Sequence, residues 1–496
     1  MSDSLPELWL RGVALNPAAP SDVLIRLMDR GAAEAALLMC EGRDLPDDVI
    51  DAALRHPAEA IRRSLARNRH IDLTRLAPLA TDRSGLVRHH LAKGPHPRPR
   101  RVRPLPDGIL VTLLTARDGG EDGMLTAGEI AQDLDFSRQI PPSFHRAMPG
   151  HEHPELRVRA TWMWQSLTPE QREALLDDPD PAVREAAGES AWELDPEAVE
   201  ATFPSMGSHG TSFALGACAL SPALIEQCFA DGRVRPLTWN RHTPAGTVAR
   251  LARHSEAKVR EMIAARPDLA PDLVAELIRD PDHTVRMRAR LHPFPRTWAE
   301  YGAINRVIGH GPDCTCPITE QDPEPSPDWF AACAASEEPV LRRVAASWPG
   351  LPAELVATLA QDEDEEVRIR LACHHPLAPP HLLLDVFVSR PAHRPHLLTL
   401  PAFPRTGTAH HTDHPDPAVR ALAAADPALP DPPVHDPDAS VRRAAAANPS
   451  LTPEALEPLL ADPRTAEGAA ANPSLPVARM HALLDRCLNG AAAPTA

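Results

Sequence analysis

The sequence contains few lysines and few aromatic residues. Lys93 and Lys258 are its only lysines, Tyr301 is its only tyrosine, and aromatic residues make up 4% of its 496 positions. A core with so few rings has to be built from Leu, Ala and Val, which favours closely packed helices over an aromatic-rich β-sandwich. Because the cations are nearly all arginines in a chain rich in Ala and Pro, we interpret them as a coding bias of a GC-rich genome rather than as a sign of nucleic-acid recognition.

Long apolar runs are also missing. No stretch approaches the roughly 18 apolar residues of a membrane span, and residues 1–17 lack the basic and apolar regions of a secretion signal. The eight cysteines are scattered, as is typical of reduced thiols. We therefore expect a soluble, cytoplasmic protein without membrane contact. The net charge of −17 argues against general attraction to nucleic acid.

The usual motifs of enzymes are missing as well. The sequence has no Gly-x-Ser-x-Gly elbow, no Gly-rich phosphate loop and no His-Glu-x-x-His pair. We therefore expect a protein that is not an enzyme and for which no catalytic residue can be named.

Proline, by contrast, is abundant, and it accompanies a repeat. The 57 prolines have to separate many short elements, because proline interrupts both helices and strands. The segment DPDHTVR recurs along the chain in variant form, each time with an acid or His six residues before an Arg. These segments occupy residues 178–184, 280–286, 362–368, 414–420 and 436–442.

An apolar residue followed by Arg marks the register of this repeat. From Val259 to Val285 the interval is 26 residues. Intervals between adjacent repeats are mostly 25 or 26 residues, with one of 22, and the gap of 51 residues from Leu10 to Ile61 has a degenerate pair, Ala35-Ala36, at its midpoint. A fixed period of this length is typical of an array of stacked units rather than of one large core. The pairs begin at Leu10, Ile61, Val87, Val158, Val183, Val234, Val259, Val285, Leu341, Val367, Val419 and Val441.

One unit shows the expected local structure. Asp280 is a good helix cap and Pro281 suits the first helical position, so we expect a helix that starts there and stops at Pro293. Before it, Leu273 and Leu277 lie at helical spacing and predict a partner helix. Each unit is thus predicted to be a hairpin of two short helices, about 25 to 26 residues long, that buries its apolar stripe by stacking on its neighbours.

The consensus of these units, roughly DPxxxVRxxxAxxPxLPxELxxxLxxD, resembles the leucine-rich repeat variant family, a bacterial relative in shape of the HEAT and armadillo repeats. The match is clearest at residues 259–280, 367–384 and 441–462. The resemblance implies an all-α protein, a right-handed α-solenoid in which the second helix of a unit can be short and 3₁₀-like. Some members carry a Cys-rich iron–sulfur segment near the N-terminus. Here Cys40 is the only cysteine among the first 200 residues, so that feature is missing.

Three stretches break the register and divide the chain. Slots near residues 111, 135, 311 and 393 are either eroded repeats or loops. We expect solenoid repeats over 1–92, 151–291 and 336–488, irregular segments over 93–150 and 292–335, an irregular Pro- and His-rich stretch at 376–414, and a disordered tail over 489–496.

Acids and arginines six residues apart form a column through the repeats. We expect each acid to cap a helix and its Arg to bridge to the next unit, so that the column is a structural ladder; an Arg column that reads a ligand is the alternative. His56, His153, His254 and His414 stand at the acid's position and are interpreted as caps. The pairs are Asp82 with Arg88, Asp178 with Arg184, Asp280 with Arg286, Asp362 with Arg368, and Asp436 with Arg442.

Two stretches contain side chains that bind metals. Cys314 and Cys316, with His310 before them and Cys333 after them, offer three sulfurs and a nitrogen for zinc or an iron–sulfur cluster, but Cys-x-Cys is less specific than paired Cys-x-x-Cys, and ordinary loop thiols are the alternative. Residues 410–414, HHTDH, are a weaker candidate of the same kind.

A calcium loop is a further candidate. Asp118, Asp122, Gly123 and Glu129 stand at positions one, five, six and twelve of an EF-hand pattern. Position three is Gly120, which has no ligand oxygen, so a capped surface turn is the alternative.

A basic patch lies where the register first breaks. From residue 83 to 106 there are arginines and a lysine but no acid, and phosphate, RNA or an acidic protein could dock there. No aromatic residue is interleaved, so base stacking is not offered, and a solvated Pro-rich loop is the alternative. The central arginines are Arg98, Arg100, Arg101 and Arg103.

These features together predict a non-enzymatic repeat scaffold that binds a protein or peptide partner along the solenoid surface. A nucleic-acid-binding HEAT-like protein and a metal or iron–sulfur repeat protein are the alternatives. No resident cofactor is expected, and the sequence does not indicate an oligomeric state.

Overall fold

The computed structural model describes residues 4–29, 33–95, 103–116, 127–291, 297–309 and 325–490. In these ranges the regular elements are short helices, and there is no strand. The predicted all-α class is therefore confirmed for the described part of the chain. None of its single helices is long and apolar enough to cross a membrane, and one bent pair, Ser208–Ala217 with Pro222–Ala230, reaches that length and composition only when both helices are taken together.

The helices form two compact units. Unit 1 combines residues 1–139 with residues 378–496, and unit 2 comprises residues 140–377. The helices of unit 1 are α1 Leu5–Leu15, α2 Ser21–Arg26, α3 Ala33–Gly42, α4 Asp47–Leu54, α5 Glu59–Leu65, η2 Leu73–Thr81, α6 Gly85–Lys93, α7 Asp107–Leu114, α8 Ala127–Ser137, α25 Pro380–Ser389, η8 Pro391–His393, α26 Arg394–Leu397, η9 Ala409–His411, α27 Pro417–Ala424, α28 Ala439–Ala446, α29 Pro453–Ala461, α30 Ala466–Ala470 and α31 Val477–Gly490.

Unit 2 is built in the same way. Its helices are α9 Pro142–Ala147, η3 Met148–Gly150, α10 Pro154–Ala160, η4 Thr161–Ser166, α11 Pro169–Leu176, α12 Pro181–Ala191, η5 Trp192–Leu194, α13 Pro196–Thr202, η6 Phe203–Ser205, α14 Ser208–Ala217, α15 Pro222–Ala230, η7 Pro236–Thr238, α16 Ala245–Leu251, α17 Ala257–Ala264, α18 Pro271–Leu277, α19 His283–Arg290, α20 Trp298–Gly309, α21 Pro327–Ala334, α22 Pro339–Ala346, α23 Ala353–Leu359 and α24 Glu365–His374.

The helices α18 and α19 show how the sequence forms one hairpin. Leu273 and Leu277 of α18 are buried, as their spacing predicts. The helix α19 starts two residues later than we expected, because its cap is Asp282, whose Oδ1 accepts the backbone N–H groups of Thr284 and Val285 at 2.8 and 3.3 Å. The assignment of Asp280 as the cap is therefore wrong.

The second helix of a hairpin often begins with a Thr or Ser before a Pro. Thr168 caps α11: its hydroxyl accepts the N–H of Gln171 at 3.2 Å, and the Gln171 side chain accepts the N–H of Thr168 at 2.9 Å. This reciprocal pair is a capping box, and it satisfies two N–H groups that the helix itself leaves unpaired. Ser221 and Thr452 cap α15 and α29 with the same hydroxyl bond.

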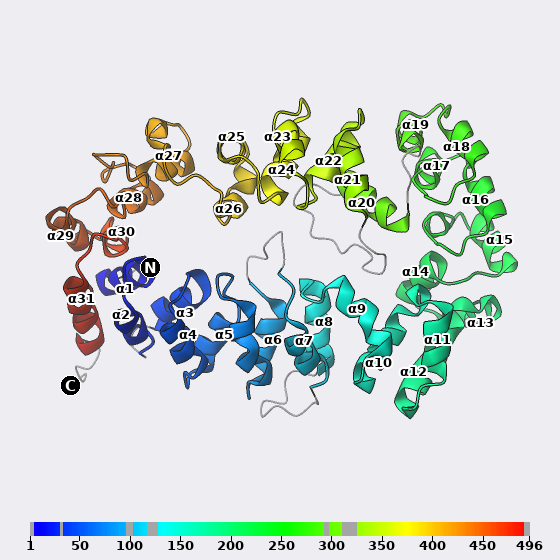
Figure 1. Ribbon diagram of the computed structural model, residues 1–496, viewed down its shortest axis with the longest axis horizontal. Coiled ribbons are helices and arrows are strands. Elements are labelled where there is room, and N and C mark those ends of the chain that lie inside the picture. Colours follow the sequence, from blue (N-terminus) through cyan, green and yellow to red (C-terminus); the bar gives the residue numbers. More distant parts are fainter. Residues whose placement is uncertain are drawn as a thin grey trace. The chain divides into compact units, whose positions relative to one another are not determined.

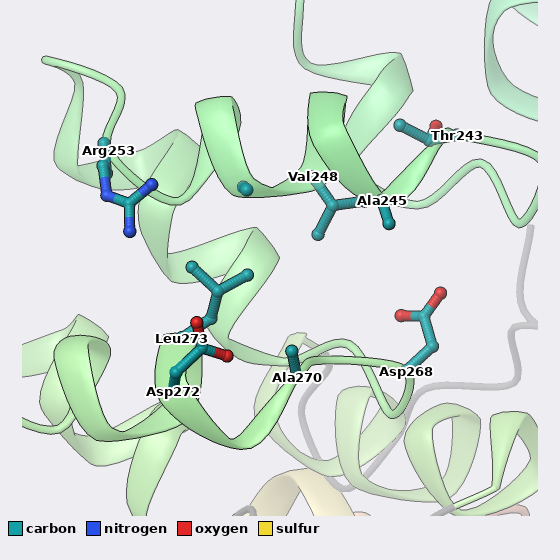
Figure 2. A pocket seen from close by; sticks show the side chains of 9 residues that line it. Thr243, Ala245, Val248, Arg253, Asp268, Ala270, Asp272 and Leu273 are labelled. Atoms are coloured by element: carbon teal, nitrogen blue, oxygen red, sulfur yellow. The ribbon is translucent and has the colours of Figure 1, made fainter.

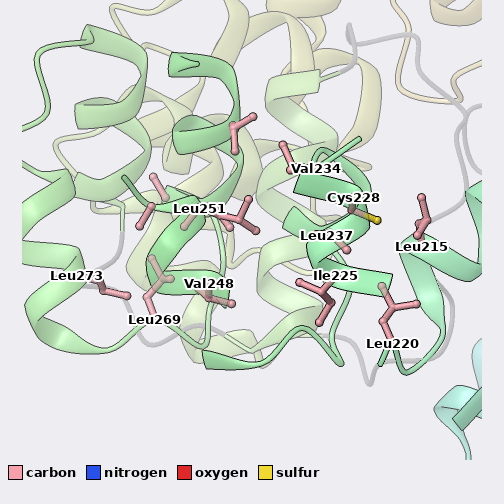
Figure 3. Packing of buried hydrophobic residues seen from close by; sticks show 14 of the residues in the cluster. Leu215, Leu220, Ile225, Cys228, Val234, Leu237, Val248, Leu251, Leu269 and Leu273 are labelled. Atoms are coloured by element: carbon pink, nitrogen blue, oxygen red, sulfur yellow. The ribbon is translucent and has the colours of Figure 1, made fainter. Parts of the chain in front are cut away.

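Apolar side chains of successive hairpins form a continuous core in unit 2. The cluster runs from Val199 in α13 to Ala289 in α19, and Figure 3 shows part of it. Each hairpin contributes residues such as Leu237, Val248 and Leu251 that are almost fully buried between its neighbours. The hairpins thus depend on one another for burial, as their single apolar stripes require.

Some of the stretches that break the sequence register are helical. Residues near 111 and 135 belong to α7 and α8, and those near 393 belong to η8 and α26, whereas the position near 311 lies outside the described residues. Residues 489 and 490, expected in a disordered tail, are the last of α31.

The two ends of the chain pack on each other within unit 1, where α1 lies beside α30 and α31 (Figure 1). Glycine makes the close approach possible. A Cβ on Gly12 would lie 2.3 Å from the Glu467 carbonyl oxygen, and one on Gly468 would lie 2.2 Å from the Arg443 carbonyl oxygen. The contact between α30 and α1 therefore depends on a glycine, as does the contact between the successive first helices α28 and α30.

Candidate partner-binding surface

Arginines and aspartates of neighbouring hairpins form bidentate ion pairs. Arg260 donates from Nε and Nη2 to the two carboxylate oxygens of Asp280 at 2.7 and 3.0 Å, and both side chains are largely buried. Such a fork holds a carboxylate in one orientation, which lysine cannot do. We call a pair a rung where the arginine Nη1 also donates to the backbone carbonyl six residues earlier. The described residues contain five rungs: Arg62–Asp82, Arg157–Asp178, Arg260–Asp280, Arg342–Asp362 and Arg420–Asp436.

The remaining nitrogen of each rung Arg binds its own loop. The Nη1 of Arg260 donates to the carbonyl oxygens of His254 and Ser255 at 2.8 and 3.1 Å. The Asp carboxylate in turn accepts the N–H two residues later: Asp280 Oδ1 lies 2.8 Å from the Asp282 nitrogen. A rung therefore joins two successive loops as well as two side chains.

The predicted pairs six residues apart are linked in another way than we expected. Arg286 reaches Asp280 through the aspartate's backbone carbonyl, at 2.7 Å, while the Asp280 carboxylate binds Arg260 of the preceding hairpin. The other four arginines of the predicted ladder make the same backbone bond. They are Arg88 to Asp82, Arg184 to Asp178, Arg368 to Asp362 and Arg442 to Asp436.

Histidine takes the aspartate's place in several loops. The Nδ1 of His56, His254 and His414 accepts the N–H two residues on, each at 3.1 Å. In the hairpin of Arg157 this residue is His151, not the predicted His153. The rung there also starts from Arg157 rather than from Arg159, so the Val158-Arg159 register is wrong by two positions.

Electrostatics within the rungs stabilise both partners in their charged forms. The bonded guanidinium of Arg157 lowers the pKa of Asp178, and Arg260 has the same effect on the pKa of Asp280. The carboxylates in turn raise the pKa of both arginines. For Asp82, burial acts to raise the pKa, but bonds from Arg62 and the Ser84 N–H outweigh it, so that the pKa is lowered.

A second ladder, of asparagines, was not predicted. Asn448 Nδ2 donates to the carbonyl oxygens of Ala424 and Asp426 in the preceding hairpin at 2.8 and 2.9 Å, and its Oδ1 accepts the Ser450 N–H. The sequence signal is an Asn followed by Pro at Asn16, Asn448 and Asn472, and no prediction used it. The other members of this ladder are Asn16, Asn68, Asn240 and Asn472.

The asparagine ladder continues across the two ends of the chain. Asn16 Nδ2 donates to the carbonyl oxygens of Ala470 and Asn472 at 2.9 and 2.7 Å. Trp9 Nε1 donates to the Leu460 carbonyl at 2.8 Å beside it, and Arg26 binds Asp485 at 2.6 Å. The first hairpin thus stacks on the last hairpin of unit 1 by the bonds that join consecutive hairpins.

Among the described residues of unit 2, three large aromatic side chains are exposed. Trp162 on η4 is 68% exposed, Phe213 on α14 is 44% exposed, and Trp239 after η7 is 41% exposed. The Trp239 indole packs against α14 at Gly216, where a Cβ would lie 2.7 Å from its Nε1, and Phe213 lies one turn before that glycine. The sequence signal was the tryptophan itself, in a chain poor in aromatic residues.

Arginines accompany these rings. The Arg159 guanidinium lies 5.0 Å from the Trp162 ring centroid. Near Trp239, the ring of Trp298 is approached by Arg241 at 4.8 Å and by the buried Arg266 at 5.2 Å. Exposed Trp with adjacent Arg is the composition that dominates binding energy in protein interfaces.

A cavity of about 270 Å³ lies between α16 and α18 (Figure 2). It is lined by Val248 and Leu273 and by the polar side chains of Arg253, Asp268 and Asp272. Two of these charged groups are already paired: Arg253 binds Glu276 at 2.6 Å, and Asp268 binds Arg266 at 2.6 Å. The cavity therefore offers a small molecule few uncommitted polar groups.

The predicted metal ligands are only partly described. Cys314, Cys316 and His310 lie outside the described residues, and Cys333 is buried in α21, where burial raises its pKa to about 12. His410 and His411 lie with ring centroids 3.9 Å apart. Among the described residues, no group of three or more His, Cys, Asp or Glu side chains is arranged to hold a metal.

Most residues of the other two predicted sites also lie outside the described residues. Asp118, Asp122 and Gly123 of the calcium loop lie outside the described residues, as do Arg98, Arg100 and Arg101 of the basic patch. Glu129 lies in the first turn of α8, and Arg103 is exposed before α7.

Comparison with known proteins gives no relative. No family model matches the chain, and no curated protein matches it.

Proposed function

We propose that this protein is a non-enzymatic α-solenoid scaffold, of the right-handed leucine-rich repeat variant type, that binds a protein or peptide partner. The proposal is supported by the rungs and the asparagine ladder, which join successive hairpins by the same bonds. A stack of this kind provides a long, rigid surface on which side chains recur at fixed positions.

The observation that carries the proposal is the exposure of Trp162, Phe213 and Trp239 in unit 2. A tryptophan buries on the order of 150 to 250 Å² when it is covered. At about 25 cal/mol per Å², covering the exposed part of Trp162 stabilises a complex by on the order of 2 to 4 kcal/mol. In the free protein, the exposed part of the ring contributes no burial free energy.

Charge favours a protein partner over nucleic acid. The rung arginines are neutralised by aspartates, and the whole chain has a net charge of −17. Nucleic-acid binding depends on unpaired Lys and Arg that displace counterions from phosphates. Aromatic rings with a few arginines suit a polypeptide surface better.

The test compares aromatic variants in affinity capture followed by crosslinking to locate the contact. The double variant Trp162→Ala/Trp239→Ala is expected to lose its partner, with a drop in affinity of at least tenfold. Phe136→Ala is the matched control, because Phe136 is an aromatic residue of unit 1 that is 65% exposed. Undiminished capture by the double variant, or capture that disappears on nuclease treatment, would contradict the proposal.

A further inference from the structure

Three arginines of unit 2 are held like rung arginines but bind no carboxylate: Arg368, whose Nη1 donates to the carbonyl oxygens of Asp362 and Glu363, and the pair Arg184 and Arg286. Arg286 Nη1 donates to the carbonyl oxygens of Asp280 and Pro281, both at 2.7 Å, and Arg184 Nη1 donates to those of Asp178 and Pro179 at 2.5 and 3.0 Å. Within the described part of the chain, no acidic side chain lies in ion-pair contact with the guanidinium of Arg184 or Arg286. We call the Nε and Nη2 edge of Arg184 and Arg286 an open fork.

The sequence explains why these forks are open. In the rungs of Arg260 and Arg342, the aspartate stands 20 residues after the arginine. Twenty residues after Arg286 stands Arg306, and Pro204 stands twenty after Arg184. The acid that would close the rung is replaced, while the bonds that orient the guanidinium are retained.

The acids nearest to each open fork already have partners. The Asp280 carboxylate binds Arg260, whereas Arg286 binds only the Asp280 backbone carbonyl. The same holds for Asp178 between Arg157 and Arg184. The nearby acid Asp282 is occupied, because it accepts the first N–H groups of α19.

We propose that the open forks of Arg184 and Arg286 bind carboxylates of the partner, so that the partner segment is an acidic peptide. This inference rests on the proposed function and specifies the chemistry of the partner. The forks are built to accept an Asp: in the closed rungs the same edge binds the carboxylate at 2.6 to 3.1 Å. Because Nη1 is already fixed by carbonyl oxygens, binding orders little additional side chain, and the two parallel bonds select a carboxylate.

Spacing follows from the repeat. Arg184 and Arg286 occupy the same position in hairpins about four repeats apart, so they lie on the same edge of the stack. At roughly 8 to 10 Å per packed helix, the forks are separated by about 32 to 40 Å. An extended peptide advances by about 3.3 to 3.6 Å per residue, so acids about eleven residues apart would reach both forks.

The experiment measures binding of fluorescein-labelled synthetic peptides by anisotropy to the full-length protein. One peptide contains Asp-Pro-Asp at two positions eleven residues apart, and a second has one of the two replaced by Asn-Pro-Asn. The two-cluster peptide is expected to bind at least tenfold more tightly, because the second contact is intramolecular once the first has formed. Equal binding of both peptides would overturn the assignment of two forks.

Protein variants identify the residues. Arg184→Gln/Arg286→Gln is expected to weaken the two-cluster peptide at least tenfold, whereas Arg233→Gln/Arg279→Gln removes the same charge from exposed arginines outside the rungs and should change binding less than twofold. Arg184→Lys/Arg286→Lys keeps the charge but loses the fork, and it is also expected to weaken binding.

The outcomes separate this inference from the proposed function. Equal weakening by the control pair, or full binding by the lysine variant, would show general charge attraction and would overturn the fork assignment. Circular dichroism shows whether the glutamine variant is folded. If it is unfolded, the peptide that carries Asn instead of Asp still tests the inference on the wild-type protein, because this peptide must bind more weakly than the Asp peptide. Failure of all peptides, with capture still dependent on Trp162 and Trp239, would reject the acidic segment and leave the proposed function standing.

Discussion

The contact between the two ends of the chain yields a quantitative prediction. Asn16 donates two buried bonds to the carbonyl oxygens of Ala470 and Asn472, and its Oδ1 accepts the Ala18 N–H at 2.9 Å. Asn16→Ala removes all three and leaves two buried carbonyl oxygens with one partner fewer. Each hydrogen bond contributes about 0.5 to 1.5 kcal/mol to the free energy of unfolding, and the loss is larger where a buried group stays unpaired. Asn16→Ala is therefore expected to lower the free energy of unfolding by about 2 to 4 kcal/mol.

The matched control is Asn448→Ala. Asn448 makes the same three bonds, but between hairpins that follow each other along the chain. If the joint between the chain ends is equivalent to a joint between consecutive hairpins, the two variants lose similar amounts of stability. The comparison is sound because both residues are fully buried and both belong to unit 1.

Two measurements check the prediction. Urea unfolding gives the loss of free energy for each variant from the midpoint and the slope. Hydrogen–deuterium exchange then locates the loss: Asn16→Ala is expected to speed exchange in α1 and α30, while Asn448→Ala does so in α27 and α28. A loss below about 0.5 kcal/mol for Asn16→Ala, beside the full loss for Asn448→Ala, would refute the argument, because it would mean that the end joint contributes no buried bonds in solution.

Two other predictions concern the rungs and the close helix approach. Arg260→Ala leaves the Asp280 carboxylate buried without its partner and is expected to cost about 3 to 5 kcal/mol, measured by urea unfolding. Because Arg260 lowers the pKa of Asp280, the stability from this pair is present above the ordinary Asp pKa of 3.8 and is lost as the pH falls through the lowered value. The acid dependence of stability should therefore be weaker in Arg260→Ala than in wild type, and an unchanged profile would count against it. Gly12→Val places atoms where a Cβ already comes within 2.3 Å of the Glu467 carbonyl, so it is expected to separate α1 from α30 and lower the melting temperature by several degrees. Gly108→Ala is its control, since nothing lies within 4 Å of a Cβ there, and an equal effect of both would contradict the packing argument.

Local features of the sequence predicted the helices well. Apolar spacing in residues 269–278 and the Thr-Pro start of α11 depend on bonds within a few residues, so the pattern alone indicates them. The cap of α19 was misplaced because Asp280 and Asp282 are equally good caps locally. What distinguishes them is Arg260, which binds the first of the two from the preceding hairpin.

The candidate surface was harder to predict for the same reason. Trp162 and Trp164 look alike in the sequence, yet Trp162 is 68% exposed and Trp164 is 3% exposed. Burial depends on which neighbours a residue meets after stacking, and a single helix does not contain that information. The open forks follow from sequence only once the spacing between the rung partners, 20 residues in three rungs and 21 or 16 in the other two, is known from the structure.

The sequence by itself determined a chain of short helical hairpins, because caps, prolines and apolar spacing act within one hairpin. Only the tertiary structure decided which carboxylate each arginine binds, which rings remain in water, and that α1 stacks on α30. These contacts join residues from 16 to more than 450 positions apart. Their free energy arises from burial and hydrogen bonds between hairpins, which come into existence only when the hairpins stack.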